Sequence, residues 1–303
     1  MIRKSPMKQK NRQTISGADF EQYFQPHNLD KALEIKAEYE DQIEVAAGTT
    51  DLLVANYEKL HQIKNWLDLD KLDELRKIEI LENELHIGAM VTHLQLMKSD
   101  WIKENFAVLA AAAEDVGSPQ IRSRGTIGGN ICTSSPAGDL LAPLLSYQAS
   151  FKLQSAEAER IVGAEKFFTG PKRNLMEADE LLTEIIIPLT ENEREGAWVK
   201  VGRRKALVIS TLTLSVVLEF EAEQIVKAGV AMGSVAPTPI RLGEVEEMML
   251  GNTLAELDYK KLGQEVKVRI NPIDDLRGTK EYREDAAADV MIRALNEIER
   301  KRG

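Results

Sequence analysis

The sequence predicts an α+β fold in two parts, and three observations support this prediction. Helical and strand patterns alternate over residues 29–188. β-branched strand segments gather after residue 197, and the charged residues 190–196 between the two regions are the best candidate for a linker. Alternating strands and helices followed by β-rich segments indicate an α+β fold.

The elements of the first part are predicted from hydrophobic periodicity and turn residues. A helix is expected over residues 29–41, with Asn28 or Asp30 near its cap, and a strand followed by a tight turn around Gly48 is expected within residues 43–54. The other expected elements are strands within 76–96, helices at 104–116 and 140–147, strands at 149–156 and 180–188, and a loop-rich passage at 157–174.

The second part begins with two strand segments over residues 198–220 and another strand and loop over residues 225–242. Helices are expected near residues 242–250 and 281–300. Residues 1–17 are polar and basic without periodicity, so they are expected to form a flexible extension.

Composition narrows the classes of function. The net charge of −10 argues against nucleic-acid binding, which needs clustered Lys and Arg, and against a membrane-surface protein. The basic start lacks the apolar segment of a secretory signal, and no apolar run is long enough to span a membrane, so the cytoplasm is expected. With a single cysteine, Cys132, this chain is not expected to hold an iron–sulfur cluster, and its 4 histidines show no metal-ligand spacing.

Two segments rich in Gly and Thr follow apolar stretches, at residues 46–52 and 126–130. Successive main-chain N–H groups in such turns form a concave donor cluster that binds anions, and a helix that starts there adds its positive end. Two such segments suggest a ligand with more than one phosphate, or a phosphate and a polyol. Each segment alone is also compatible with an ordinary turn, so these residues by themselves indicate only an anion site of unknown ligand.

The order of the motifs resembles the FAD-binding medium subunit of the molybdenum hydroxylases, the xanthine dehydrogenase and carbon monoxide dehydrogenase family. The matching segments are AGTTD at 47–51, IGAMVT at 87–92, QIRSRGTIGGN at 120–130, SPAGD at 135–139, FFTGP at 167–171, DELLTEIIIP at 179–188, APTPIR at 236–241, EMMLG at 247–251 and RGTKEYR at 277–283. The resemblance runs from about residue 20 to the end of the chain.

This resemblance implies a two-lobed FAD-binding domain of the vanillyl-alcohol-oxidase and p-cresol-methylhydroxylase type over residues 18–190. Its lobes would cover about residues 18–67 and 68–190, and a smaller C-terminal α+β domain of the CO dehydrogenase flavoprotein type would cover 196–303. The family also implies electron transfer: an iron–sulfur small subunit would pass electrons to FAD, a molybdopterin large subunit would oxidise the substrate, and the electrons would leave to an acceptor such as NAD.

The family gives roles to particular residues of this chain. The backbone of Ala47, Gly48, Thr49, Thr50 and Asp51 would hold the pyrophosphate of FAD. Other contacts to the cofactor are implied for Thr126, Gly129 and Asn130 (pyrophosphate or polar flavin edge), Asp139 (sugar hydroxyls), Val116 (beside the isoalloxazine), Leu182 (adenine or flavin side) and Lys200 (flavin ring).

Thr49 departs from the family pattern, which has a second glycine at this position. Because threonine resists positive φ, the site requires Thr49 to have ordinary dihedral angles and to make its contact through its N–H group, and FAD binding is expected to persist. The alternatives are a stand-alone flavin oxidoreductase, for which the sequence shows no substrate base, and an assembly subunit without flavin. By themselves, Arg122 and Arg124 fit either phosphate binding or pairing elsewhere.

Overall fold

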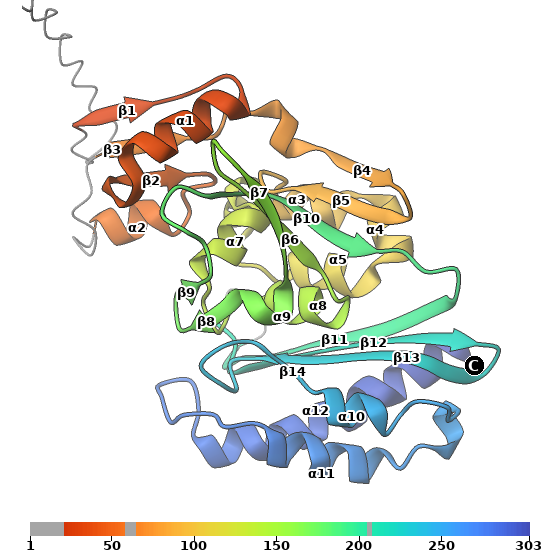
Figure 1. Ribbon diagram of the computed structural model, residues 1–303. Coiled ribbons are helices and arrows are strands. Elements are labelled where there is room, and N and C mark those ends of the chain that lie inside the picture. Colours follow the sequence, from red (N-terminus) through yellow and green to blue (C-terminus); the bar gives the residue numbers. More distant parts are fainter. Residues whose placement is uncertain (1–20, 58–64, 205–207) are drawn as a thin grey trace, which may run out of the picture.

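The computed structural model describes residues 21–57, 65–204 and 208–303 (Figure 1). The predicted extension, residues 1–17, therefore lies outside the described residues. The chain forms a small N-terminal lobe, a larger lobe around a second sheet, and a C-terminal layer of sheet and helices (Figure 1).

The small lobe has a three-stranded sheet in the order β1-β3-β2. These strands are Gln22–Phe24, Asn65–Asp68 and Ile43–Ala46, and both outer strands run parallel to β3. Helix α1 (Leu29–Tyr39) packs its buried residues against this sheet, and α2 (Leu52–Tyr57) begins shortly after β2. The turn between β2 and α2 is the first of the two glycine-bearing segments.

The larger lobe has an antiparallel five-stranded sheet in the order β4-β5-β10-β6-β7. Its strands are Ile78–Leu81, Glu84–Gly88, Leu181–Pro188, Ser150–Gln154 and Glu159–Gly163 in that order. Between β5 and β6 the chain forms α3 (His93–Lys98), α4 (Asp100–Asn105), α5 (Ala107–Glu114), α6 (Pro119–Arg124), α7 (Ile127–Thr133) and α8 (Leu141–Ser146). After β7 come the short helix α9 (Ala164–Phe167) and the hairpin of β8 (Phe168–Gly170) and β9 (Arg173–Asn174).

The C-terminal layer is built on an antiparallel sheet in the order β11-β12-β13-β14. Its strands are Glu193–Val201, Leu212–Glu221, Gln224–Gly233 and Ile240–Arg241, and its helices are α10 (Gly243–Glu247), α11 (Tyr259–Arg269) and α12 (Lys280–Arg302). The sheet lies between α5 and α8 of the larger lobe and α10 and α12 below it (Figure 1). Helices on both faces explain why nine successive residues of β12 are buried instead of alternating.

The contact between the larger lobe and the C-terminal sheet is close. A Cβ added at Gly229 would lie 2.0 Å from the Ser146 carbonyl oxygen, so only glycine fits where β13 meets α8. The Ser146 and Ser215 hydroxyls are 2.5 Å apart across the same contact. The guanidinium of Arg194 lies 5.1 Å from the Phe106 ring centroid and 5.3 Å from that of Tyr147. These contacts hold β11, which carries Lys200, against the larger lobe.

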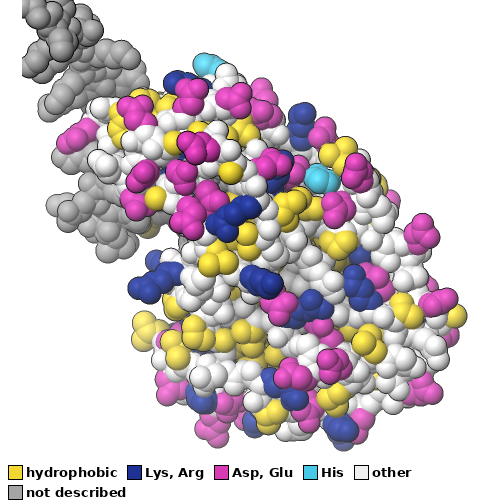
Figure 2. Space-filling model, viewed as in Figure 1, with side chains coloured by type: hydrophobic (Ala, Val, Ile, Leu, Met, Phe, Trp, Pro, Cys, Tyr) yellow, Lys and Arg dark blue, Asp and Glu magenta, His cyan; other side chains and the backbone are white. Residues whose placement is uncertain are grey.

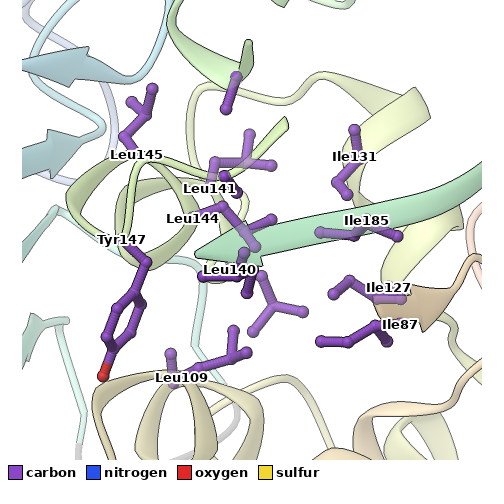
Figure 3. Packing of buried hydrophobic residues seen from close by; sticks show 14 of the residues in the cluster. Ile87, Leu109, Ile127, Ile131, Leu140, Leu141, Leu144, Leu145, Tyr147 and Ile185 are labelled. Atoms are coloured by element: carbon purple, nitrogen blue, oxygen red, sulfur yellow. The ribbon is translucent and has the colours of Figure 1, made fainter. Parts of the chain in front are cut away.

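Helix α7 packs one apolar face on the larger sheet. Ile127 and Ile131, four residues apart, point toward Ile87 and Ile185 of the strands (Figure 3). Residues at this spacing lie on one face of a helix, and both side chains are fully buried. This packing, together with the Thr126 cap, makes residues 127–133 helical.

Several predicted elements are confirmed and others are wrong. The helix expected at 29–41 is α1, which begins after the N-cap Asn28, and the helix expected at 140–147 is α8. The helix expected at 104–116 is interrupted at Phe106, whose buried ring packs 5.0 Å from that of Tyr147. That ring enters the core because the backbone leaves helical geometry there (φ −137°, ψ 50°).

The boundary between the two regions also needs correction. The charged residues 190–196 are not a linker throughout, because β11 begins at Glu193 and pairs that residue with Phe220. The passage at 157–174 is structured, since it contains β7, α9, β8 and β9. Helix α11 was not predicted.

Within the described ranges, none of the helices combines the length and hydropathy that a bilayer span requires. On the face shown in Figure 2, acidic and basic side chains are interspersed.

Candidate functional site

The two glycine-bearing segments lie side by side. A Cβ added at Gly48 would lie 2.1 Å from the Arg124 carbonyl oxygen and 2.8 Å from the Gly125 Cα, so the two backbones are in direct contact. The Thr133 hydroxyl is 3.5 Å from the Asp51 carboxylate. The small lobe and the larger lobe therefore present both segments to one place.

The first segment carries free main-chain donors. Within the described part of the chain, the N–H groups of Gly48, Thr49, Thr50 and Asp51 donate to no acceptor. The segment lies just before the N-terminus of α2, where helical N–H groups also lack intrahelical partners. Successive N–H groups in such a turn can bind an anion.

The condition of ordinary dihedral angles at Thr49 is not met. Its φ is +59°, in the left-handed region that the family's glycine adopts without strain. A left-handed residue is also what turns successive N–H groups to one side. The backbone keeps the glycine-like geometry, and the threonine bears the strain of roughly 1–3 kcal/mol. Because the N–H groups of residues 48–51 have no acceptor within the described residues, they stay available to a ligand, and the expectation that FAD binding persists is kept.

The second segment differs, and the prediction of main-chain donors is wrong for it. The four successive N–H groups of residues 127–130 are already bonded within the protein, at 2.9–3.0 Å. Their acceptors are the carbonyls of Val91, Ala89 and Thr126 and the Thr126 hydroxyl. The Gly-Gly-Asn stretch is the first turn of α7 and not a hairpin, so its amides stabilise a helix.

Side chains and a glycine face remain available in the second segment. The Thr126 hydroxyl accepts from Gly129 N–H, which leaves its own hydrogen free to donate. A Cβ at Gly129 would meet only the Thr126 hydroxyl within 4 Å, so a ligand can approach the backbone there. Among the described residues, the buried Asn130 Oδ1 has no hydrogen-bond partner.

A second group of predicted residues gathers where β11 meets the larger lobe. Lys200 Nζ donates to Asp139 Oδ2 at 2.7 Å and to the Asp115 carbonyl oxygen at 2.9 Å. The neighbouring Val116 is 8% exposed and belongs to the core of the larger lobe. The structure thus brings together Val116, Asp139 and Lys200, which are far apart in the sequence.

The carboxyl group of Asp139 has an unusual environment. Burial raises its pKa to about 6, although the nearby Lys200 ammonium opposes this shift. In the described residues its second oxygen, Oδ1, is buried without a hydrogen-bond partner. A buried acceptor without a donor is costly, so this oxygen is suited to accept from a hydroxyl group of a ligand.

The remaining candidate residues, Leu182, Arg122 and Arg124, lie in the core, support a loop or are exposed. Leu182, 4% exposed on β10, is part of the core of the larger lobe. Arg122 donates to the carbonyls of Val116 and Gly117 at 3.1 and 3.0 Å, so it supports this loop. Arg124 is exposed at the end of α6.

Sequence reasoning missed Asp115 and Trp198. Trp198 Nε1 donates to Asp115 Oδ2 at 2.8 Å, beside the bond from Lys200 to the same residue. The alternation of a strand gave one usable signal, because Trp198 and Lys200, two residues apart, lie on the same face of β11. No sequence pattern indicated Asp115 as their partner.

These features fit a dinucleotide flavin. The N–H donors at 48–51, which have no acceptor in the described part of the chain, suit a diphosphate, and the acceptor oxygens of Asn130 and Asp139 suit hydroxyl and N–H groups. Glycine at 48 brings the two lobes together and glycine at 129 leaves room for a ligand.

Comparisons with known proteins agree with this fit. The family model described as the FAD binding domain in molybdopterin dehydrogenase matches residues 18–190, and that of the CO dehydrogenase flavoprotein C-terminal domain matches residues 197–298. The nicotinate dehydrogenase FAD-subunit of Eubacterium barkeri is 34% identical over 78% of this chain and 81% of its own length. The xanthine dehydrogenase FAD-binding subunit of Escherichia coli O157:H7 is 30% identical over 88% of this chain and 91% of its own.

A solved structure shows the same fold. A chain of carbon monoxide dehydrogenase from Hydrogenophaga pseudoflava superposes with a TM-score of 0.88 at 28% identity, covering 94% of this chain and 98% of that one. The predicted fold, a two-lobed FAD-binding domain with a C-terminal α+β domain, is thereby confirmed. The chain belongs to the family of FAD-binding medium subunits of the molybdenum hydroxylases, as an oxidoreductase component whose cofactor is FAD.

Proposed function

We propose that this chain holds FAD between its two lobes and its C-terminal sheet and relays electrons from an iron–sulfur subunit to an acceptor such as NAD. The observation that carries the proposal is the row of N–H donors at residues 48–51, which have no acceptor among the described residues and lie against residues 124–125, just before the second segment. Flavin, when bound, supplies the chemistry: it stores two electrons and exchanges them singly or in pairs.

The N–H groups of residues 47–51 bind the diphosphate in this proposal. Their dipoles replace bulk attraction, which a chain of net charge −10 cannot supply. The hydroxyl of Thr126 and the side chain of Asn130 bind polar groups of the cofactor, and Gly129 leaves room for it. Asp139 Oδ1 accepts from a sugar hydroxyl.

Lys200 and Val116 act on the flavin ring in this proposal. The Lys200 ammonium has three donors, of which Asp139 and Asp115 occupy two. The third is left for the ring system, where a positive charge stabilises electron density. Val116 and Leu182 line the apolar side of the cofactor.

The proposed partners follow from what the chain lacks and from what its relatives are. The one cysteine of these 303 residues cannot ligate an iron–sulfur cluster, and in this proposal the electron donor is a separate polypeptide. Relatives carry the names FAD-subunit and medium chain, which indicates assembly with further subunits. We propose that these are an iron–sulfur small subunit and a molybdopterin large subunit, in the cytoplasm.

The proposed division of the chain is a FAD-binding domain at 18–190, with lobes at about 18–67 and 68–190, and a C-terminal domain at 196–303. In this division the cofactor contacts of Lys200 come from the second domain and all others from the first.

Purification of the full chain tests the proposal. The protein should be yellow, and heating should release about one FAD per chain. A colourless protein that gains no flavin absorbance on incubation with FAD contradicts the proposal.

The Asp139→Ala variant tests the site more narrowly. It removes the acceptor proposed for the sugar hydroxyl, so FAD should dissociate about tenfold more readily, the effect of one hydrogen bond of about 1.4 kcal/mol. Asp100→Ala, on the exposed surface of α4, is the matched control and should retain FAD as the unmodified chain does. Equal retention by both variants removes Asp139 from the site.

A further inference from the structure

The Lys200 ammonium is held by more than its ion pair with Asp139. Its second hydrogen bond goes to the main-chain oxygen of Asp115, at 2.9 Å. The side chain of the same Asp115 accepts from Trp198 Nε1 at 2.8 Å. Trp198 and Lys200 project from one face of β11, so a single residue of the larger lobe receives two side chains of the C-terminal sheet.

Lys200, Asp115 and Trp198 differ in how deeply their side chains are buried, and this difference indicates what each one does. The Lys200 side chain is only 9% exposed, whereas Asp115 is exposed at the end of α5. Trp198 packs its ring against the core of the larger lobe. The exposed carboxylate of Asp115 does not fill the core, but its hydrogen bond orients the indole of Trp198. The oriented indole in turn holds β11 in place next to Lys200.

We propose that Asp115 and Trp198 are positioning residues, which hold the Lys200 ammonium in the orientation that sets the reduction potential of the flavin. The inference rests on the proposed function, because it takes the flavin to lie beside Lys200. Reduction adds negative charge to the ring, and a fixed cation nearby stabilises that charge more than a mobile, hydrated one. The Asp115–Trp198 hydrogen bond thus acts on the flavin through Lys200 without touching it.

The test measures the midpoint potential of FAD bound to the full chain, by spectroscopic titration with a reductant. Trp198→Phe keeps the aromatic packing and loses the indole donor, so it should lower the potential in the same direction as Lys200→Gln but by less. Flavin content and the thermal midpoint of unfolding are read in parallel, because a purely structural role would change these instead.

Two variants at position 115 carry the same change of charge, so a difference between their potentials does not come from that charge. Asp115→Asn and Asp115→Ala both delete one negative charge, but only asparagine keeps a side-chain oxygen for Trp198. The alanine variant should therefore have a lower potential than the asparagine variant. The shift caused by Trp198→Phe should vanish when it is made in the Asp115→Ala background, since both changes break the same hydrogen bond. Glu114→Ala, exposed one residue away, controls for a nearby charge.

The possible outcomes distinguish a failure of this inference from a failure of the proposed function. Additive shifts for Trp198→Phe and Asp115→Ala, equal potentials for the two position-115 variants, or loss of flavin from Trp198→Phe overturn the inference. If Lys200→Gln leaves the midpoint potential of FAD unchanged, the inference and the proposed role of Lys200 both fail, while FAD binding stands. Only absence of flavin from the unmodified chain overturns the proposed function itself.

Discussion

The two glycine-bearing segments have similar composition and opposite hydrogen-bonding states. The N–H groups of residues 48–51 have no acceptor within the described residues, whereas those of residues 127–130 are all bonded inside the protein. The first segment lies beside α2, whose Leu53, Val54 and Tyr57 are exposed. The second lies on the core, where Ile127 and Ile131 are fully buried (Figure 3).

This difference shows that a run of Gly and Thr predicts two distinct structures. Where the chain turns without apolar side chains at helical spacing, the amides have no acceptor within the described residues and stay available for a ligand. Where apolar residues recur at helical spacing, the same residue types cap and start a helix, and only side chains face the ligand. The residues just before the second segment also support the first, because the backbone of Gly48 packs against the Arg124 carbonyl.

Gly48→Ala should break this arrangement most severely. The added Cβ would overlap the Arg124 carbonyl oxygen at 2.1 Å, and neither backbone can move without separating the lobes. We expect a loss of at least ~2 kcal/mol in the free energy of unfolding and little bound FAD. Urea denaturation and flavin release measure the two effects. Gly163→Ala, where nothing lies within 4 Å of the new Cβ, is the control; similar behaviour of both variants would refute the close contact.

The pH dependence of stability tests the burial of His93, which packs beside the second segment. Burial lowers its pKa to about 4, with a smaller contribution from Arg122, and its ring lies 3.0 Å from the Cβ position of Gly125. The folded state therefore binds fewer protons than the unfolded state between about pH 4 and 6.5. Stability contributed by neutral His93 is present above pH 6.5 and is lost as the pH falls toward 4.

The His93→Phe variant isolates this contribution. Between pH 7 and pH 5 the free energy of unfolding of the unmodified chain should fall by about 2 kcal/mol more than that of the variant. The expectation follows from about 1.36 kcal/mol for each pH unit below the unfolded pKa of His93. Urea titrations at both pH values measure it, and the difference between proteins cancels other groups, such as Asp139. Parallel pH profiles would mean that His93 is not buried as described. His27→Gln, at an exposed position, should follow the unmodified chain.

Thr126→Ala removes the cap of α7. The hydroxyl that accepts from Gly129 N–H is lost, so the free energy of unfolding should fall by about 1 kcal/mol. FAD affinity should fall as well, because the same hydroxyl is proposed to donate to the cofactor. Ser118→Ala removes the equivalent cap of α6 and should change stability but not FAD affinity. If both variants bind FAD as the unmodified chain does, Thr126 has only a structural role.

Thr49→Gly should have the smallest effect. Glycine relieves the strain of a β-branched residue at φ +59°, and its greater freedom in the unfolded chain offsets part of this gain. We expect a change of about +1 kcal/mol or less in the free energy of unfolding, with FAD affinity kept or improved. Weaker FAD binding by the glycine variant would show that the threonine side chain itself contacts the cofactor.

The sequence predicted the fold, because motif order and hydrophobic periodicity depend on residues near one another in the chain. It predicted Asp139 and Lys200 separately, through the family resemblance. It did not predict which amides are free, because that depends on acceptors supplied by distant residues such as Ala89 and Val91.

Long-range contacts explain the other failures. The interruption at Phe106 follows from packing against Tyr147, and the pairing of Glu193 with Phe220 turns a charged stretch into strand. The Asp115–Trp198 bond joins residues 83 positions apart. None of these leaves a periodic signal in the local sequence.

Titration of the flavin-free chain with FAD and with riboflavin tests the central claim most directly, because riboflavin shares the ring but lacks the diphosphate. If the amides of residues 48–51 hold the diphosphate, FAD should bind at least ~100-fold more tightly than riboflavin, as expected for two or more charge-assisted hydrogen bonds. ADP should compete with FAD. Equal affinities for FAD and riboflavin, with no competition by ADP, would contradict the account.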